Sequence, residues 1–232
     1  MTFQDLDTAT VEALYVEGVL FDMDGLLVDT ESLAMQGLEQ AAAEMEITAP
    51  ESFCHAMIGV PADHCLVLVQ DRFGPGFPAE EYLAAASRHM NALIEAGALR
   101  LKPGVRCLLS HLEALGMPKA VATSSSRVKA ERHLRSTGIL DRFDVVVTRD
   151  DVARGKPHPD LFMHAARKLG LRAEHCLALE DSYNGVRAAH AAGSTVIMVP
   201  DLLPPTNEMR DRCALIATDL HAVRPLVLQS QS

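Results

Sequence analysis

Two aspartates separated by one residue, Asp22 and Asp24, directly follow the apolar run 19–21 and precede Gly25. Short apolar runs are typical of buried strands, and alternate residues of a strand point to the same side. The two carboxylates are therefore expected on one side of the chain as it leaves the sheet. Burying such a pair is costly unless a cation or protons compensate the charge. The pattern is compatible with a Mg²⁺-dependent nucleophile beside a general acid/base and equally with a solvated turn, which uses the same residue types, and this stretch alone does not distinguish the two.

A second pair of carboxylates, Glu180 and Asp181, follows the apolar run 176–179 in the same way. Mg²⁺ prefers oxygen ligands in octahedral geometry and keeps several of its waters. Asp22, the backbone carbonyl of Asp24 and Asp181 are expected to supply the protein ligands, with Glu180 beside them or acting through water. The alternative is a charged loop that caps the next helix through Asn184. Two carboxylate clusters at two parallel strand ends favour a shared metal.

Two further stretches could bind a phosphate group. Residues 121–126 read Val-Ala-Thr-Ser-Ser-Ser between an expected strand and an expected helix. Hydroxyls and backbone N–H groups at a helix N-terminus bind phosphate, although Ser and Thr are also common helix caps. Lys156 stands between Gly155 and Pro157 in an expected loop. A lysine in a loop is usually solvated, but the neighbouring prolines restrict the backbone there and favour a positioned side chain.

The whole pattern D-x-D-G-x-L-x-D-T at residues 22–30 resembles the first motif of the haloacid dehalogenase superfamily. The 123–125, 155–160 and 180–181 stretches resemble its three later motifs, in the same order, so the resemblance runs from about residue 16 to residue 199. Its nearest subgroup is the beta-phosphoglucomutase-like and pseudouridine-5′-phosphatase-like phosphatases. The resemblance implies catalytic roles for Asp22, Asp24, Thr123 and Lys156, substrate binding by Gly25, Ser124 and Ser125, and a Mg²⁺ site of Asp22, Asp24, Glu180 and Asp181.

The elements that must position these residues alternate between strand and helix. Strands are expected at 16–22, 119–122, 143–147, 176–180 and 195–199, and helices at 127–137, 159–169 and 185–192. This alternation predicts an α/β fold with a doubly wound parallel sheet, whose ligands bind at the carboxyl ends of the strands. Residues 34–98 show helical periodicity throughout. We expect a core of residues 1–33 and 99–232 with an inserted all-helical cap of residues 34–98, which corresponds to the class I cap of the superfamily.

The composition restricts the partners and the compartment. The chain has 232 residues, a net charge of −10 and five scattered cysteines. An acidic protein of this kind is not expected to bind nucleic acid. No apolar run approaches the roughly 20 residues that span a bilayer, and residues 1–17 carry no Lys or Arg of a secretory signal. We expect a cytoplasmic protein, a monomer or weak homodimer, that acts on a small phosphorylated metabolite.

The expected activity is that of a Mg²⁺-dependent phosphatase, which hydrolyses a small sugar or nucleotide phosphate monoester through an aspartyl-phosphate intermediate. One alternative is a beta-phosphoglucomutase-type phosphosugar mutase. Against it, Ala34 stands where the mutases carry a cap histidine, and residues 55–70 hold no Lys or Arg for a second phosphate. A less favoured alternative is a phosphate-sensing binding protein, which has no need of an acid/base at Asp24.

Overall fold

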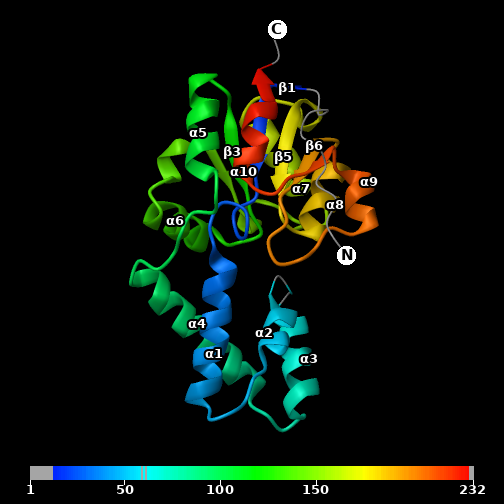
Figure 1. The fold of residues 1–232 in the computed structure, drawn as a ribbon. Coiled ribbons are helices and arrows are strands. Elements are labelled where there is room, and N and C mark those ends of the chain that lie inside the picture. The colour runs from blue at the N-terminus through cyan, green and yellow to red at the C-terminus, as the bar shows by residue number, and fades with distance from the viewer. Residues whose placement is uncertain (1–12, 59, 61, 230–232) are drawn as a thin grey trace.

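A six-stranded parallel sheet forms the centre of the larger part of the molecule (Figure 1). The computed structural model describes residues 13–58, 60 and 62–229. The sheet order is β4-β3-β2-β5-β6-β7, and every neighbouring pair is parallel. The strands are β2 (Gly18–Phe21), β3 (Lys119–Ala122), β4 (Val145–Val147), β5 (Cys176–Glu180), β6 (Thr195–Met198) and β7 (Leu215–Ile216). The expected doubly wound parallel sheet is confirmed.

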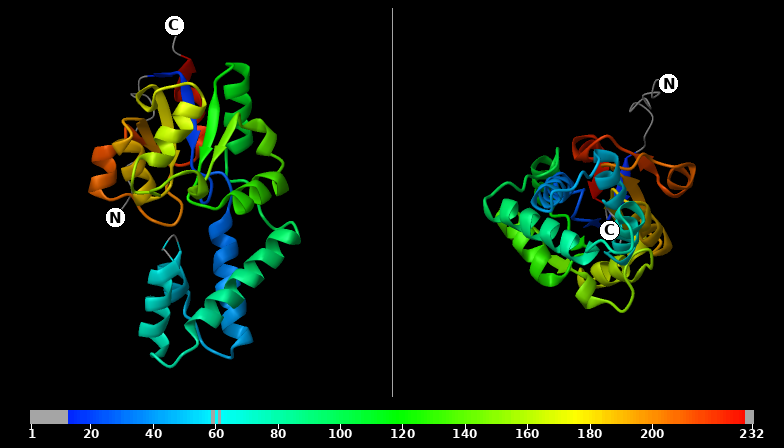
Figure 2. Two further views of the ribbon diagram at one scale, coloured as in Figure 1. Left: turned by 180° about the vertical axis from the view of Figure 1, so that it is seen from behind. Right: turned by 90° about the horizontal axis from the view of Figure 1, so that it is seen from below.

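Helices cover both faces of this sheet, as the views from behind and below show (Figure 2). Val19 and Phe21 of β2 belong to one hydrophobic cluster with residues of α5 and α6, whereas Leu20 belongs to a second cluster with residues of α7 and α8. The alternation along β2 is what a strand buried on both faces requires. The helices are α5 (Val105–Ala114), α6 (Arg127–Ser136), α7 (Asp160–Lys168), α8 (Tyr183–Ala191), α9 (Asn207–Arg212) and α10 (Leu220–Val223).

The order of the strands reverses between β2 and β5. The chain builds β2, β3 and β4 in one direction and then returns to place β5, β6 and β7 on the other side of β2. In open parallel sheets, ligands bind in the crevice at the carboxyl ends of the strands where this reversal occurs. Asp22 follows β2 and Asp181 follows β5, so both lie at this point.

The first strand differs from the prediction. The prediction of a single strand over residues 16–22 is wrong. Instead, β1 (Leu14–Val16) ends before Glu17 and pairs with β8 (Val227–Gln229) in a separate two-stranded sheet. The backbone N–H of Glu17 donates to the carbonyl of His175 instead of continuing one ladder. The partner strand lies at the other end of the chain, so no local pattern near residue 16 could reveal it.

Four helices form a separate lobe next to the carboxyl ends of the strands (Figure 1). They are α1 (Thr30–Glu44), α2 (Glu51–Met57), α3 (Ala62–Phe73) and α4 (Ala79–Glu95). The lobe has its own hydrophobic cluster, which includes Leu38, Cys54 and Tyr82. The backbones of α1 and α4 pack closely at Gly37, where a Cβ would lie 2.6 Å from the carbonyl oxygen of Ala86. The hydroxyl of Tyr82 donates a hydrogen bond to the carbonyl of Leu38 at 3.1 Å.

Two neighbouring segments connect the lobe to the α/β body. The N–H of Asp29 donates to the carbonyl of Arg100, and the N–H of Lys102 donates to the carbonyl of Leu27, at 2.9 and 3.0 Å. These bonds hold the outgoing and returning chain side by side where the two parts meet. None of the helices in the described ranges has the length and apolar character needed to cross a membrane.

Candidate active site

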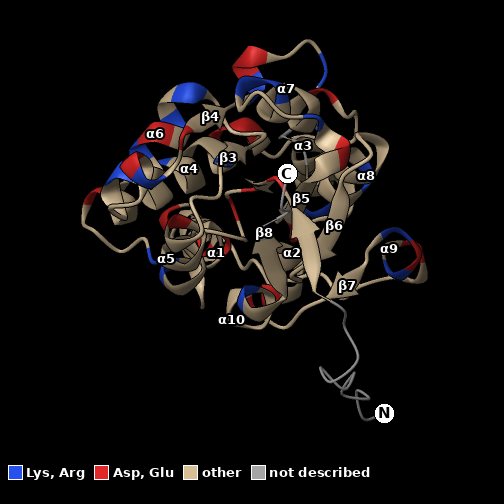
Figure 3. Ribbon diagram, turned by 90° about the horizontal axis from the view of Figure 1, so that it is seen from above, with Lys and Arg blue, Asp and Glu red and all other residues tan. Residues whose placement is uncertain are grey.

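Three buried carboxylates meet at the carboxyl ends of β2 and β5. Asp22, Glu180 and Asp181 each offer an oxygen, and these oxygens all lie within 4.8 Å of one another. Glu180 is fully buried, and Asp22 and Asp181 are each 7% exposed. By contrast, Figure 3 shows acidic and basic residues interspersed on outer helices such as α6 and α9. Acidic groups gathered inside the protein need a compensating charge.

Lys156 supplies part of that charge. Its Nζ donates to Oδ1 of Asp22 and to Oε1 of Glu180, and the side chain is only 5% exposed. The same ammonium group lies 5.1 Å from the centre of the Phe162 ring, within the range of a cation–π contact. Lys156 lies in the segment between β4 and α7. The fold therefore brings a cation from a third segment of the chain to the ends of β2 and β5. The sequence-based expectation of a positioned Lys156 side chain agrees with this geometry.

The second oxygen of Glu180 is engaged elsewhere. Oε2 accepts hydrogen bonds from the backbone N–H groups of Asp181 and Ser182 and from the Ser182 hydroxyl, at 3.1, 3.2 and 3.0 Å. A Cβ on Gly185 would lie 1.9 Å from the carboxyl carbon of Glu180, so only glycine leaves room for this side chain. Glu180 therefore has one oxygen, shared with Lys156, that faces the other two carboxylates.

The cluster keeps an excess of negative charge. Three carboxylates and one ammonium group carry a net charge of −2 when all are ionised. Burial raises the pKa of Asp22 to about 7, because the lowering effect of Lys156 is smaller and Glu180 adds to the rise. Burial, together with Asp22 and Glu180, also raises the pKa of Asp181 well above its ordinary value. Burial opposes the charge of Lys156, but Asp22 and Glu180 outweigh it and raise the pKa of Lys156.

A divalent cation fits this donor set. Its charge would balance the excess of −2, and carboxylate oxygens are the ligands that Mg²⁺ prefers. Gly25 keeps the approach to Asp181 free of side chains, since a Cβ there would lie 2.3 Å from Oδ2 of Asp181. Gly25 also has a φ of +84°, which L side chains rarely adopt. Both constraints explain a glycine directly after the two aspartates.

Asp24 lies apart from the three clustered carboxylates. Its Oδ2 accepts a hydrogen bond from the Ser125 hydroxyl at 2.7 Å, and its Oδ1 lies 3.6 Å from Nδ1 of His133. Burial tends to raise the pKa of Asp24, but the His133 contact, the charge of Lys129 and the Ser125 hydrogen bond lower it to about 2. The two aspartates of the first motif therefore have opposite pKa shifts, because Asp22 lies among buried carboxylates whereas Asp24 faces a hydroxyl, an imidazole and a lysine.

The serine- and threonine-rich loop after β3 reaches the same region. Thr123 is buried, and its Oγ1 accepts a hydrogen bond from the backbone N–H of Ser125 at 3.0 Å. Ser124 is exposed, whereas Ser125 is partly buried and engaged with Asp24. The structure thus brings Ser125 to Asp24, a contact that the sequence analysis did not specify.

Sequence reasoning missed three groups near the site. His133, on α6, is fully buried and faces Asp24. Lys102 forms an ion pair with Asp201 at 2.6 Å at the edge of the helical lobe. Burial and the neighbouring Asp201 carboxylate raise the pKa of Glu31, in the first turn of α1, to about 8. A signal existed for His133, because residues 130 and 134 mark the buried face of its helix and a polar residue at 133 falls on that face.

The fold and the clustered carboxylates define an α/β enzyme with an acidic, metal-binding type of site at the carboxyl ends of its strands. The family model described as "Haloacid dehalogenase-like hydrolase" matches residues 19–199, and the chain belongs to this family. It is 34% identical over 188 residues to a Drosophila melanogaster protein named "Probable pseudouridine-5'-phosphatase", covering 78% of this chain and 80% of that protein. It is 30% identical over 178 residues to the "Phosphorylated carbohydrates phosphatase" of Thermotoga maritima, covering 77% and 82%.

A solved structure shares the fold. The crystal structure of a haloacid dehalogenase family hydrolase from Deinococcus radiodurans, with bound phosphate and sodium, superposes with a TM-score of 0.78 at 27% identity. The match covers 92% of this chain and 95% of that one. The membership predicted from the four motifs is confirmed.

Proposed function

We propose that this protein is a Mg²⁺-dependent phosphatase that hydrolyses small phosphate monoesters through an aspartyl phosphate on Asp22. One observation carries the proposal. Asp22 lies in a buried cluster of three carboxylates and Lys156, whose net charge is −2 when all are ionised, while Asp24 is held separately by Ser125 with a pKa of about 2. A nucleophile, an acid/base and a place for a cation thus occur together, as phosphoryl transfer requires.

Asp22 and Asp181 would hold the metal ion, together with the backbone carbonyl of Asp24. Glu180 lies beside them with Oε1, which it shares with Lys156. When bound, Mg²⁺ supplies positive charge that balances the carboxylates and the developing charge on the phosphoryl oxygens. Lys156 contributes as a second fixed positive charge, and Thr123 and the N–H of Ser124 are proposed to donate to the same oxygens.

Asp22 and Asp24 divide the chemistry between them. A carboxylate oxygen of Asp22 attacks phosphorus, and the bond from phosphorus to the leaving oxygen breaks as Asp24 gives that oxygen a proton. Water then attacks the phosphorus of the aspartyl phosphate, Asp24 takes the proton from this water, and inorganic phosphate leaves as Asp22 is regenerated. With a pKa of about 2, Asp24 rests as a carboxylate. A bound phosphate dianion adds negative charge nearby, which raises the pKa of Asp24 and favours its protonated form.

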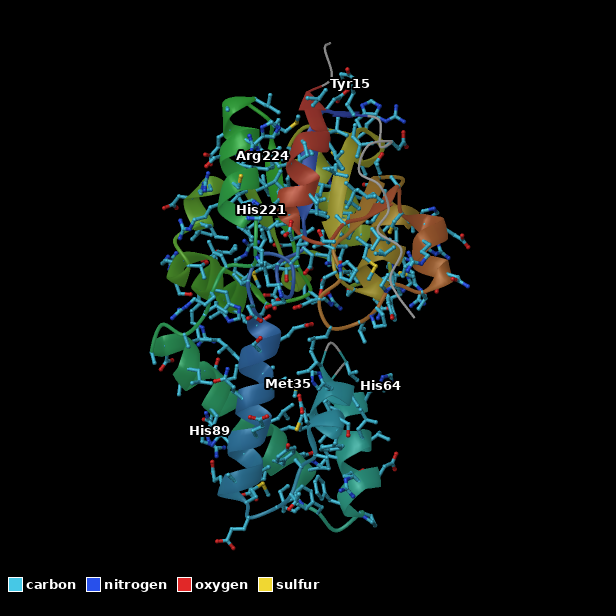
Figure 4. All side chains as sticks on the ribbon, viewed as in Figure 1. Tyr15, Met35, His64, His89, His221 and Arg224 are labelled. Atoms are coloured by element: carbon cyan, nitrogen blue, oxygen red, sulfur yellow. The ribbon has the colours of Figure 1, made fainter. Side chains whose placement is uncertain are left out.

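Residues 34–98 are proposed to act as a cap over a core of residues 1–33 and 99–232. Closing the lobe over the strand ends would exclude water other than the nucleophile. Figure 4 shows Met35 on α1 and His64 near the end of α3 that lies toward the α/β body. His64 is exposed, so it is available to contact the leaving group of a substrate.

The substrate is proposed to be a sugar or nucleotide phosphate. The names of the relatives support this class, since one is described as acting on phosphorylated carbohydrates and another on pseudouridine 5′-phosphate. Such compounds carry a neutral, hydroxyl-rich leaving group, which suits a cap in which the sequence from 55 to 70 contains no Lys or Arg.

The test is a panel of phosphorylated sugars and nucleotides with Mg²⁺, in which released inorganic phosphate is measured. We expect multiple turnovers with at least one member of the panel and none with Asp22→Asn. Formation of a stable phosphoenzyme without turnover on every substrate would instead indicate a phosphate-binding protein. Asp141→Asn, which changes an exposed aspartate of the core, is the matched control and should retain wild-type rates.

A further inference from the structure

His133 is a buried histidine on α6, and no described residue forms a hydrogen bond with its ring. The residue is 0% exposed, and neither Nδ1 nor Nε2 has a hydrogen-bond partner within the described part of the chain. Oδ1 of Asp24 is likewise buried without a hydrogen bond, and it lies 3.6 Å from Nδ1 of His133. Two unsatisfied polar atoms therefore face each other inside the protein.

Packing alone does not explain a histidine at this position. Its neighbours on the buried face of α6, Ala130 and Leu134, are apolar and 0% exposed. Burying an imidazole without hydrogen bonds costs free energy that an aliphatic side chain of similar size avoids. The carboxylate of Asp24 is the polar group that the ring faces, which points to a role in holding that carboxylate.

We propose that His133 is a positioning residue, whose Nδ1–H donates to Oδ1 of Asp24 during catalysis while Ser125 donates to Oδ2. The inference rests on the proposed function of Asp24 as acid/base. The separation of 3.6 Å must shorten by roughly half an ångström to reach ordinary hydrogen-bond length. Two donors on the two oxygens fix the plane of the carboxylate, whereas Ser125 alone leaves it free to turn about its Cβ–Cγ bond.

The role predicts a dependence on the leaving group. An alkyl leaving oxygen needs a proton from Asp24 as its bond to phosphorus breaks, whereas p-nitrophenolate leaves without one. The parameter kcat/KM reports the steps up to formation of the aspartyl phosphate. A misplaced Asp24 should therefore lower kcat/KM for an alkyl phosphate and leave that for p-nitrophenyl phosphate nearly unchanged.

The second half-reaction gives an independent signature. Hydrolysis of the aspartyl phosphate needs Asp24 as base whichever ester was used. A variant with a misplaced Asp24 should accumulate phosphoenzyme on p-nitrophenyl phosphate. Rapid mixing would then show a burst of p-nitrophenolate, close to one equivalent per enzyme, before a slow steady state.

The experiment compares four proteins with Mg²⁺ on glycerol 3-phosphate, or the best alkyl ester of the panel, and on p-nitrophenyl phosphate. His133→Leu removes the donor and keeps an apolar side chain of similar volume. His133→Asn places an amide N–H near the position of Nδ1 and tests rescue. Leu134→Ala, the neighbouring buried residue, reports the effect of lost packing on the same helix. Thermal melting of each variant records whether it is folded.

We expect His133→Leu to lower kcat/KM for the alkyl ester about 10- to 100-fold, a part of the 10²–10⁴ that general acid–base catalysis contributes. Its value for p-nitrophenyl phosphate should stay within about threefold, and His133→Asn should recover most of the loss. Leu134→Ala should lower the melting temperature without changing the ratio of the kcat/KM values for the alkyl ester and p-nitrophenyl phosphate.

The inference is overturned if His133→Leu keeps the wild-type ratio of kcat/KM values for the two esters, or if His133→Asn recovers none of the activity that His133→Leu loses on the alkyl ester. In either case, turnover by the wild-type protein still supports the proposed function. If the wild-type protein releases phosphate from neither ester, the proposed function fails, and the inference fails with it. If His133→Leu does not fold, the Asn variant decides. It supports the inference by folding with a near-wild-type ratio and overturns it by folding with a uniform loss on both esters.

Discussion

Replacing Asp22, the proposed nucleophile, should make the metal-free protein more stable. The pKa of Asp22 in the folded protein is about 7, above the 3.8 that applies to an unfolded chain. A folded carboxyl group with a raised pKa binds its proton more tightly than the unfolded one does. Its contribution to stability is therefore fully present below pH 3.8 and is lost as the pH rises toward 7. Asp22→Asn removes this loss because the amide does not ionise.

The magnitude follows from the gap between the two pKa values. Each pKa unit corresponds to about 1.4 kcal/mol, so the gap between 3.8 and about 7 amounts to about 4 kcal/mol at pH 8. At pH 5 the unfolded group is already ionised while the folded one is not, and the penalty is roughly 2 kcal/mol. Asp22→Asn should therefore gain about twice as much stability at pH 8 as at pH 5.

The assay is urea unfolding in excess EDTA at both pH values, followed by circular dichroism. The control is Asp141→Asn, an exposed carboxylate of the same domain, which should change the free energy of unfolding by less than about 0.5 kcal/mol. Added Mg²⁺ should stabilise the wild-type protein, by about 2.7 kcal/mol at a hundred times the dissociation constant, and stabilise Asp22→Asn much less. If Asp22→Asn is less stable than wild type in EDTA at pH 8, the argument that the buried, ionised Asp22 destabilises the folded protein is refuted.

Three further outcomes follow from the same geometry. Activity should vanish in excess EDTA and return with Mg²⁺, and Asp181→Ala should cut turnover by orders of magnitude; full activity in EDTA would rule out the metal site. Gly185→Ala should displace Glu180, since the new Cβ would lie 1.9 Å from the carboxyl carbon of Glu180. We expect the free energy of unfolding in urea to fall by about 1–3 kcal/mol and turnover to fall strongly. An unfolding curve identical to that of the wild type would contradict this. With beta-glucose 1-phosphate, a bisphosphate primer and Mg²⁺, inorganic phosphate should exceed glucose 6-phosphate, because residues 55–70 hold no Lys or Arg for a second phosphate; the reverse would favour the mutase.

Local pattern in the sequence was enough to predict the sheet. The apolar runs 19–21 and 176–179 each end directly before a pair of acidic residues. The alternation of strand and helix patterns along the chain implies parallel strands, whose carboxyl ends lie at one edge of the sheet. The contact between the carboxylates of Asp22 and Asp181 could therefore be expected without coordinates. The helical character of residues 34–98 could be expected for the same reason, since α1 and α4 have regularly spaced apolar residues.

Strand pairing between the two ends of the chain required the structure. The parallel pair β1 and β8 joins residues near the start and end of the described chain, and the pattern around Leu14 resembles the beginning of the next strand. Pairing of backbone N–H and carbonyl groups is the same for any side chain, so it leaves no mark in the sequence at either end.

The sequence by itself determined which residue types meet at the strand ends, because periodicity places Asp22, Asp24 and Asp181 there whatever the details of packing. Only the tertiary structure decided how their charges are shared. Lys156 is 134 residues from Asp22, Ser125 is 101 residues from Asp24, and the His133 ring faces Asp24 from the buried side of α6. Hydrogen bonds and burial set the two opposite pKa shifts of Asp22 and Asp24, and both depend on neighbours that only the folded chain brings together.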